Sequence, residues 1–239
     1  MSADAILITG VAKRVGLHLA RTFLARGIPV IGTYRTERPA LDELARGGAE
    51  LHHCDFYDEV QIGMLGRSVA QRHGGLRAVI HNASDWLGED SALSPGDIMW
   101  RMMQVHANAP YQLNLVLAPL LQACADPHAD IIHIGDYVSS RGSSKHIAYA
   151  ASKAAQDNLT LSFSSLLAPK VKVNSIAPAL VIFDEADDDT YREKARNKSL
   201  MGHEGGLDEL QHAVDYLLRS SYVTGRVLPL DGGRHLRVA

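Results

Sequence analysis

Tyr149 and Lys153 are the pair of side chains in this sequence best placed to move a proton. They stand four residues apart in a segment, 147–167, whose pattern predicts a helix, so they lie one turn apart on the same face. A nearby ammonium group favours the phenolate and lowers the pKa of a phenol, which would let Tyr149 give or take a proton near neutral pH. The same spacing is common on ordinary helix surfaces, so the rest of the chain must decide between the two interpretations.

Short apolar segments alternate with longer amphipathic segments along the chain. The predicted strands are residues 5–9, 29–33, 50–53, 78–81, 130–134, 172–176 and 226–229. The predicted helices are residues 15–25, 40–46, 59–72, 99–123, 147–167 and 208–219. Apolar strands that alternate with helices indicate a parallel sheet covered on both faces, and we expect one α/β domain over residues 1–239.

Residues 183–206 depart from this alternation. They contain an acidic run at 184–189 and the pair Gly205-Gly206. The tract is too long and too polar for a simple connection, which suits a mobile lid over a site. A solvated surface excursion is an equal alternative on composition alone.

Composition and charge argue against several classes of function. The 239 residues are 46% hydrophobic, ample for a core, and a formal net charge of −3 gives no reason to expect nucleic acid or an anionic membrane as a partner. Cys54 and Cys124 lack metal-ligand spacing and are expected to be reduced, buried thiols, and we expect no metal. Without a signal-peptide pattern or a spanning apolar run, we expect a cytoplasmic protein.

A glycine-rich turn joins the first predicted strand to the first predicted helix. In Thr9-Gly-Val-Ala-Lys-Arg-Val-Gly16, Gly10 permits a tight turn and Gly16 permits close packing of helix on strand. The N–H groups at the start of the helix can then bind a pyrophosphate. Because Arg14 replaces one of the three usual glycines, the motif is weak alone, but its place at the first strand–helix junction strengthens it.

The second predicted strand leads into Tyr34-Arg35-Thr36, where an enzyme that binds NADH usually carries Asp or Glu. Arg35, with Lys13 and Arg14 nearby in the glycine-rich turn, suits a ribose 2′-phosphate instead. We therefore expect NADPH as the cofactor. The alternative is that Arg35 is only a surface arginine.

Polar side chains also follow the third, fourth and fifth predicted strands, at the edge where an open α/β sheet binds its ligands. They are Asp55, Asn82, Ser84 and Asp136. Asp136 can approach the Tyr149 hydroxyl if its strand and the following helix pack together. Trp86 can stack on a flat ligand or pack under a loop, and Asn108 is either a satisfied core group or part of a proton relay.

Together these residues resemble the short-chain dehydrogenase/reductase family over essentially the whole chain. The matching positions are Thr9-Gly10 to Gly16, Asp55, Asn82-Ala83, Asn108, Tyr149, Lys153, Asn174 to Pro178, and Asp231-Gly-Gly233. The resemblance implies one Rossmann-type, doubly wound domain with strand order 3-2-1-4-5-6-7, often assembled as a homotetramer. It also implies a nicotinamide cofactor and a relay of Asn108, Tyr149 and Lys153.

Two departures narrow the resemblance to the pteridine reductase branch. Asp136 stands where family members usually carry a catalytic Ser, and Arg14 replaces the middle glycine. A Ser hydroxyl suits a carbonyl oxygen, whereas a dihydropterin presents a C=N bond and a 2-amino edge from which a carboxylate accepts hydrogen bonds. We expect NADPH-dependent reduction of a dihydropterin, with Asp136 anchoring the ring, feeding a proton through Tyr149, or both. Dihydrofolate should react more slowly because its C6 substituent is bulkier.

Three alternatives stay open at this point. Asp136 is also a plausible capping carboxylate at a turn. A carbonyl reductase acting on 3-oxoacyl thioesters or quinones would use the same fold, although we would then expect Ser at position 136. A non-catalytic, NADPH-binding regulatory protein is the third alternative, and the intact Tyr149–Lys153 pair argues against it.

The expected site residues fall into three groups. The catalytic group is Tyr149, Lys153, Asp136 and Asn108. The NADPH-binding group is Gly10, Lys13, Arg14, Val15, Gly16, Tyr34, Arg35, Thr36, Asp55, Phe56, Asn82, Ala83, Ser84, Tyr149, Lys153, Pro178, Leu180 and Val181. The substrate-binding group is Arg14, Ser84, Trp86, Asp136 and Tyr149.

Overall fold

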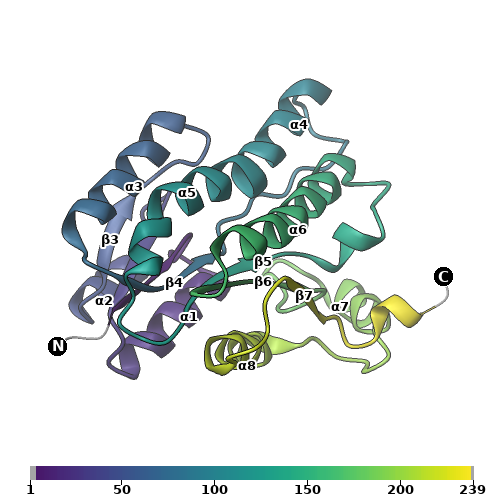
Figure 1. Cartoon of the computed structure of the whole chain (residues 1–239). Coiled ribbons are helices and arrows are strands. Elements are labelled where there is room, and N and C mark those ends of the chain that lie inside the picture. The colour runs from purple at the N-terminus through teal and green to yellow at the C-terminus, as the bar shows by residue number, and fades with distance from the viewer. Residues whose placement is uncertain (1–3, 238–239) are drawn as a thin grey trace.

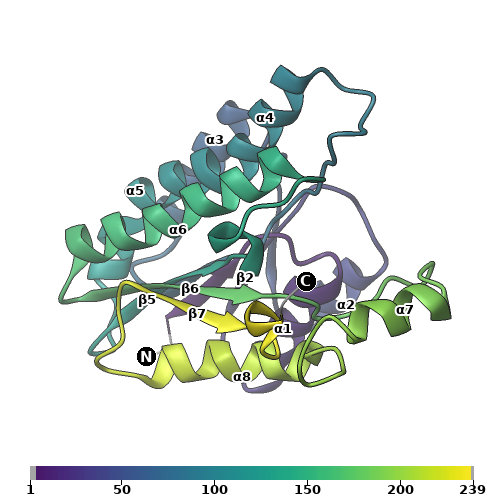
Figure 2. The same cartoon turned by 90° about the vertical axis from the view of Figure 1, so that its right-hand side faces the viewer.

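The computed structural model describes residues 4–237, which are built on a seven-stranded sheet (Figures 1 and 2). Its strands are β1 (Ala5–Ile8), β2 (Val30–Tyr34), β3 (Glu50–His53), β4 (Leu76–His81), β5 (Ala129–Ile134), β6 (Val171–Pro178) and β7 (Arg226–Leu230). They lie in the order β3-β2-β1-β4-β5-β6-β7, and every neighbouring pair is parallel. The predicted α/β class and strand order are confirmed.

Helices cover both faces of the sheet (Figures 1 and 2). One face carries α1 (Arg14–Ala25), α2 (Ala40–Arg46) and α8 (Gly206–Arg219). The other carries α3 (Glu59–Arg72), α4 (Pro95–Met103), α5 (Ala109–Gln122) and α6 (Ile147–Leu167). Because side chains alternate along a strand, Leu7 packs toward α3 and α5 while Ile6 and Ile8 pack toward α1 and α8. Both faces are therefore buried in apolar cores.

Two segments differ from the predicted elements. Residues 99–123, predicted as part of one helix, form the end of α4, a π-helical turn at Gln104–Asn108, and α5. A π-helical turn adds a residue to one turn and changes which side chains face the core. Residues 183–206, predicted as irregular, contain the helix α7 (Asp189–Arg196), whose N-cap Asp188 accepts from the N–H of Tyr191. The acidic run therefore serves in part to start a helix.

The start of α6 is fixed by a carboxylate from another loop. Glu89 Oε1 accepts from the N–H of Ile147 at 2.8 Å and of Ala148 at 3.3 Å. These are N–H groups at a helix start, which have no partner within the helix. Glu89 thus anchors the first turn of the helix that carries Tyr149 and Lys153.

Cys54 and Cys124 are free and buried, as the sequence predicts. Burial raises the pKa of the Cys54 thiol to about 12, so it stays protonated and unreactive. Within residues 4–237, no group of three or more His, Cys, Asp or Glu side chains is arranged to hold a metal ion. No helix in that range is both long enough and apolar enough to cross a membrane.

Candidate active site

The carboxyl end of β5 and the first turns of α6 bring Asp136 and Tyr149 together. The Tyr149 hydroxyl donates to Asp136 Oδ2 at 2.8 Å, and Tyr149 is 8% exposed. The other carboxylate oxygen of Asp136 accepts from the N–H of Val138 at 2.9 Å. The predicted approach of Asp136 to Tyr149 is confirmed. Asp136 also caps the short helical turn Tyr137–Ser140, so the capping role and the site role coexist.

Lys153 lies one helical turn from Tyr149 and is 2% exposed. Its Nζ donates to Ile134 O at 2.8 Å and lies 5.8 Å from the centroid of the Tyr149 ring. Burial lowers the pKa of Lys153 to about 8, although Asp136 and Asp157 act in the opposite direction. Lys153 is therefore a buried amine that titrates not far above neutral pH.

The expected lowering of the Tyr149 pKa by Lys153 is wrong. Burial raises the pKa of Tyr149 well above its ordinary value, and the adjacent Asp136 raises it further, while Ser84 acts in the opposite direction. The reason is geometric: the Lys153 ammonium bonds Ile134 O, so the carboxylate is the nearer charge. Burial raises the pKa of Asp136 as well. The pair consequently holds its protons more firmly than free side chains would.

His106, which the sequence interpretation passed over, takes the place in the site that was expected for Asn108. It lies in the π-helical turn and is 0% exposed. Its Nε2 is 2.8 Å from Ser84 Oγ and its Nδ1 is 2.8 Å from Ser152 Oγ. The imidazole also meets the Tyr149 ring edge-on, with the centroids 5.3 Å apart. His106 thus joins the loop after β4 to α6, directly beside Tyr149.

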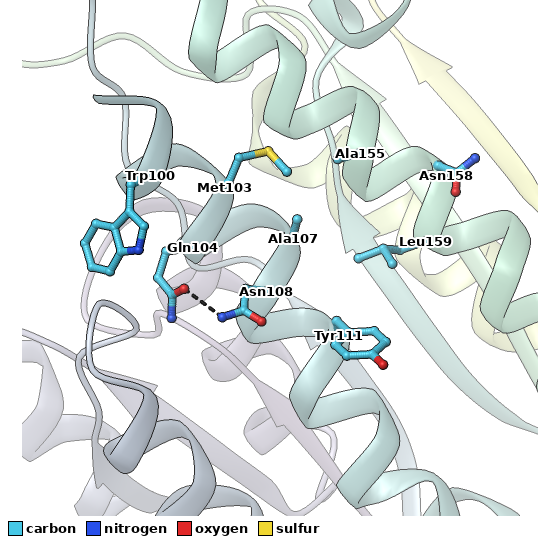
Figure 3. A pocket seen from close by; sticks show the side chains of 9 residues that line it. All are labelled: Trp100, Met103, Gln104, Ala107, Asn108, Tyr111, Ala155, Asn158 and Leu159. Atoms are coloured by element: carbon cyan, nitrogen blue, oxygen red, sulfur yellow. Dashed lines mark hydrogen bonds between the residues drawn. The ribbon is translucent and has the colours of Figure 1, made fainter. Parts of the chain in front are cut away.

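The side chain of Asn108 forms its hydrogen bonds with residues other than Tyr149 and Lys153, so the structure gives no support to its expected relay role. Its amide nitrogen donates to Gln104 Oε1 at 2.7 Å and to Glu59 Oε1 at 2.9 Å. It lines a cavity of about 560 Å³ between α4, α5 and α6, together with the half-exposed rings of Trp100 and Tyr111 (Figure 3). Residues two apart on a helix lie on different faces, so choosing Asn108 instead of His106 selected another face of the π-helical turn.

The hydrogen bonds of His106 fix its tautomer. The Ser152 hydroxyl donates to Tyr149 O at 2.7 Å, so its oxygen accepts from the Nδ1–H of His106. Nε2 is then the acceptor for the Ser84 hydroxyl. Burial, with the charge of Lys153, lowers the pKa of His106 well below its ordinary value, which keeps the ring neutral.

The glycine-rich turn packs too closely for side chains. A Cβ on Gly10, whose φ is +75°, would lie 3.0 Å from the Cα of Ala83. A Cβ on Gly16 would lie 2.1 Å from Gly10 O. Asn82 holds the turn in place, because its Nδ2 donates to Thr9 O at 2.9 Å and to Gly10 O at 3.1 Å. The predicted roles of Gly10 and Gly16 in turn and packing are confirmed.

The start of α1 is open to an anion. Its N-cap residue Lys13 makes no side-chain cap, and no acidic residue stands in the first turn, so the terminal N–H groups have no side-chain acceptor within residues 4–237. Arg14 has a φ of +53° and points toward the tract after β6, where it pairs with Asp184 and donates to Ile182 O at 3.1 Å. Val15 is half-buried behind it.

Arg35 is held at the carboxyl end of β2. Its Nη1 donates to Asp85 Oδ2 at 3.2 Å, and its guanidinium carbon lies 5.5 Å from the centroid of the Tyr57 ring. The Tyr57 hydroxyl donates to the same carboxylate oxygen at 2.7 Å. Asp55 in turn accepts from the N–H of Tyr57 at 3.0 Å, while Phe56 is buried in the core. Arg35 is therefore oriented by a partner rather than free on the surface.

The remaining predicted residues border this edge of the sheet. Tyr34 is half-buried and Thr36 is exposed beside Arg35. Pro178 ends β6. Leu180 and Val181 follow, and their carbonyls accept from the N–H groups of residues 205 and 206 at 3.0 and 2.9 Å, which closes the base of the 183–206 tract. Trp86 is 63% exposed and stacks on the ring of His146, with centroids 4.2 Å apart.

Comparison with known proteins places the chain in a family. Residues 10–235 match the family model described as enoyl-(acyl carrier protein) reductase, a model of short-chain dehydrogenases/reductases. The chain is 51% identical to a dihydromonapterin reductase of Klebsiella pneumoniae and 52% identical to one of Escherichia coli, each over 97% of both chains. The chain belongs to the short-chain dehydrogenase/reductase family.

Solved structures of the short-chain dehydrogenase/reductase family share this fold. The alternative dihydrofolate reductase 1 of Brucella canis, complexed with NADP, has a TM-score of 0.87 at 24% identity, covering 100% of this chain and 97% of that one. The corresponding protein of Brucella suis, also with NADP, has a TM-score of 0.85 at 25% identity, covering 100% and 98%. The predicted family resemblance, including its pteridine reductase branch, is confirmed.

Two substitutions of His106 separate its hydrogen bond with Ser84 from its hydrogen bond with Ser152. A Gln side chain carries its amide near the place of Nε2 and keeps an acceptor for Ser84, whereas Asn carries its amide near Nδ1 and keeps the contact with Ser152. Because Ser84 is the partner next to the Tyr149 hydroxyl, we expect His106→Gln to retain several times more turnover than His106→Asn. Each loses one buried hydrogen bond and should be destabilised by about 1–3 kcal/mol.

Steady-state turnover and urea unfolding of both variants check this expectation. Similar unfolding free energies with unequal kcat would show that the Ser84 contact matters for the chemistry. Equal kcat values in the two variants would contradict a role that passes through Ser84.

Proposed function

We propose that this protein reduces 7,8-dihydromonapterin to 5,6,7,8-tetrahydromonapterin with NADPH and reduces dihydrofolate more slowly. The observation that carries the proposal is the hydrogen bond between the Tyr149 hydroxyl and Asp136, at the position where carbonyl reductases of this family use Ser. A partly buried carboxyl group beside a phenol suits a C=N bond, whose nitrogen must gain a proton. The dihydromonapterin reductases at 51 and 52% identity support the same substrate.

The residues at the strand ends fit NADPH. The uncapped start of α1 and the glycine cradle accept a pyrophosphate, and Arg35, held by Asp85 and Tyr57, accepts the ribose 2′-phosphate. When bound, NADPH supplies the hydride that C6 of the pterin receives. The other proposed cofactor contacts come from Lys13, Arg14, Val15, Tyr34, Thr36, Asp55, Phe56, Asn82, Ala83, Ser84, Tyr149, Lys153, Pro178, Leu180 and Val181.

Tyr149 and Asp136 deliver the proton in this proposal. The raised pKa of Tyr149 keeps its hydroxyl protonated, so it can donate to N5 of the pterin, and Asp136 or a water restores the proton. Lys153 holds the nicotinamide ribose, and its charge offsets the negative charge left on Tyr149. His106, in the place that was expected for Asn108, anchors Ser84 in the site.

The substrate lies against Asp136, Ser84 and Tyr149, with Trp86 at the edge of the pterin ring. Arg14 reaches the pterin only by giving up its contacts with Asp184 and Ile182 O. Loss of these Arg14 contacts would free the first residues of the 183–206 tract to move. We therefore propose that this tract closes over the bound pterin.

Oxidation of NADPH, followed at 340 nm, tests the proposed function directly. Dihydromonapterin, dihydrofolate and an acetoacetyl thioester are compared side by side, and each is repeated with NADH. We expect the highest kcat/KM for dihydromonapterin with NADPH, and slower turnover of dihydrofolate. Turnover of the thioester alone would make the protein a carbonyl reductase, and no turnover of any substrate would favour a non-catalytic role.

The pH dependence of turnover depends on Lys153. Its pKa of about 8 means that the charged form needed beside Tyr149 is present below pH 8 and is lost above it. We expect kcat/KM for dihydromonapterin to fall about tenfold per pH unit above pH 8, and the fall to shift to higher pH in Lys153→Arg, because Arg stays charged. A wild-type profile that stays flat to pH 10 would rule out this role for Lys153.

We also propose that the protein is a cytoplasmic homotetramer. Helices α4, α5 and α6 support an assembly, because they expose Trp100, Tyr111, Leu115 and Leu161 by 45–52%. Trp100 and Tyr111 also line the cavity that contains Asn108. Analytical ultracentrifugation should find a species of four 26.0 kDa chains. We expect Leu161→Glu to lower that mass, whereas a wild-type protein of 26.0 kDa at micromolar concentration would contradict the tetramer.

A further inference from the structure

Three segments that are distant in the sequence meet beside Asp136. Arg141, in the loop before α6, donates to Arg234 O at 3.4 Å and to His235 O at 3.2 Å in the C-terminal turn. That turn also contacts the end of the 183–206 tract, because Gly232 O accepts from the N–H groups of residues 200 and 201 at 2.9 and 3.2 Å. Arg237 closes the arrangement by donating to Ser199 O at 2.9 Å. These contacts therefore hold the loop before α6, the C-terminal turn and the end of the 183–206 tract close together.

Each of these segments brings at least one basic side chain that forms no ion pair within residues 4–237. Together we call these four side chains the cationic rim: Lys145, Lys194, Lys198 and Arg234. None of the four side chains makes a hydrogen bond or an ion pair with any residue in the 4–237 range. Burial lowers the pKa of Lys198, and the charges of the other three members lower it further, so all four are near enough to repel one another.

Neighbouring arginines show that the lack of partners is particular to the rim. On α7, Arg196 forms two hydrogen bonds with Glu204, at 2.8 and 3.2 Å. Arg192 donates to Asp187 O at 2.9 Å and to Asp184 O at 3.0 Å. Like charges gathered without ion-pair partners cost free energy, and part of that cost is recovered when an anion binds among them.

The rim adjoins the proposed site of proton transfer. The guanidinium carbon of Arg234 lies 4.3 Å from the centroid of the Tyr137 ring, and Tyr137 follows Asp136 directly. Arg234 is close enough for its charge to act on Asp136. Burial raises the pKa of Asp136, and the positive charge of Arg234 acts in the opposite direction. In the proposed function N5 of the pterin lies at Tyr149 and Asp136, and the C6 substituent departs from the adjacent ring atom. That substituent consequently starts beside the rim.

We propose that the cationic rim binds an anionic group, a carboxylate or a phosphate, carried on the C6 substituent of the dihydropterin. This inference rests on the proposed function, because it takes the position of the ring from it. Dihydrofolate carries such carboxylates on its glutamate, and a phosphate ester of dihydromonapterin carries the equivalent charge on the same ring. Unmodified dihydromonapterin has a neutral side chain and makes no use of the rim's charge.

Kinetics with matched substrates test the rim. The substrates are dihydromonapterin, its phosphate ester, dihydrofolate, and dihydrofolate with a second γ-linked glutamate. We expect Lys198→Gln with Arg234→Gln to raise KM for the anionic substrates at least roughly fivefold per charge lost, with little change for dihydromonapterin. The wild-type KM for the anionic substrates should rise with salt, and this dependence should weaken in the double variant.

Two controls separate charge from structure. Lys198→Arg with Arg234→Lys keeps both charges and should keep the wild-type KM values within about twofold. Arg67→Gln removes one exposed charge from α3, on another part of the molecule, and should change nothing. A rise in KM that is confined to the phosphate ester, or to the substrates that carry glutamate, still supports anion binding by the rim. It also identifies which anion the rim binds.

Other results would overturn the inference. Equal losses for neutral and anionic substrates, or a parallel rise in KM for NADPH, would show that the rim supports the fold or the cofactor. The wild-type protein could instead reduce dihydromonapterin while its KM values for the anionic substrates are no lower and do not depend on salt. That result would overturn the inference about the rim and leave the proposed function intact. If no pterin is turned over, the proposed function fails, and quenching of tryptophan fluorescence by anionic and neutral pterins still decides whether the rim binds anions.

Discussion

The hydrogen bond between Tyr149 and Asp136 is the interaction on which the rest of the site depends. Tyr149 is buried and Asp136 is partly buried, and the loss of water around them raises the pKa values of both groups above their ordinary values. The amine of Lys153, only one helical turn away, limits the cost of any negative charge that the pair carries. Because the charges of the three groups interact, they titrate together, and in the proposed function the proton for the substrate belongs to the set rather than to one side chain.

Holding that pair in place requires that α6 cannot rotate about its axis. The inner face of α6 carries a buried polar row, Ser152, Gln156 and Thr160, at helical spacing. Buried polar groups must find partners, and they find them in His106, Lys153 and His133. Any rotation of the helix would break the hydrogen bonds of Ser152 with His106 and of Thr160 with His133, because both connect α6 to other elements. The polar layer thus specifies the orientation of Tyr149 more strictly than apolar packing alone.

The parts of this arrangement that rest on local pattern were predictable from the sequence. Alternating strands and helices gave the sheet, and Gly10 and Gly16 marked the turn where close backbone contact excludes side chains. The choice between His106 and Asn108 was not predictable in this way, because it depends on the phase of a helix interrupted by a π-helical turn. Residue type favoured the amide, whereas the geometry selected the imidazole.

The ion pairs and charge clusters of the site were not predictable from the sequence either, because they depend on residues that are distant along the chain. The contact of Arg14 with Asp184 joins residues 170 positions apart, and only the folded chain brings them together. Likewise, the formal net charge of −3 conceals a separation in space: acids cluster at 184–189, while cations without acidic partners within residues 4–237 gather beside Asp136. A local field of one sign acts on a ligand at short range, whatever the charge of the whole chain. Because Asp136 needs nearby cations to hold a negative charge in a buried site, the same charges that assist the carboxylate also make the mouth of the site attractive to anions.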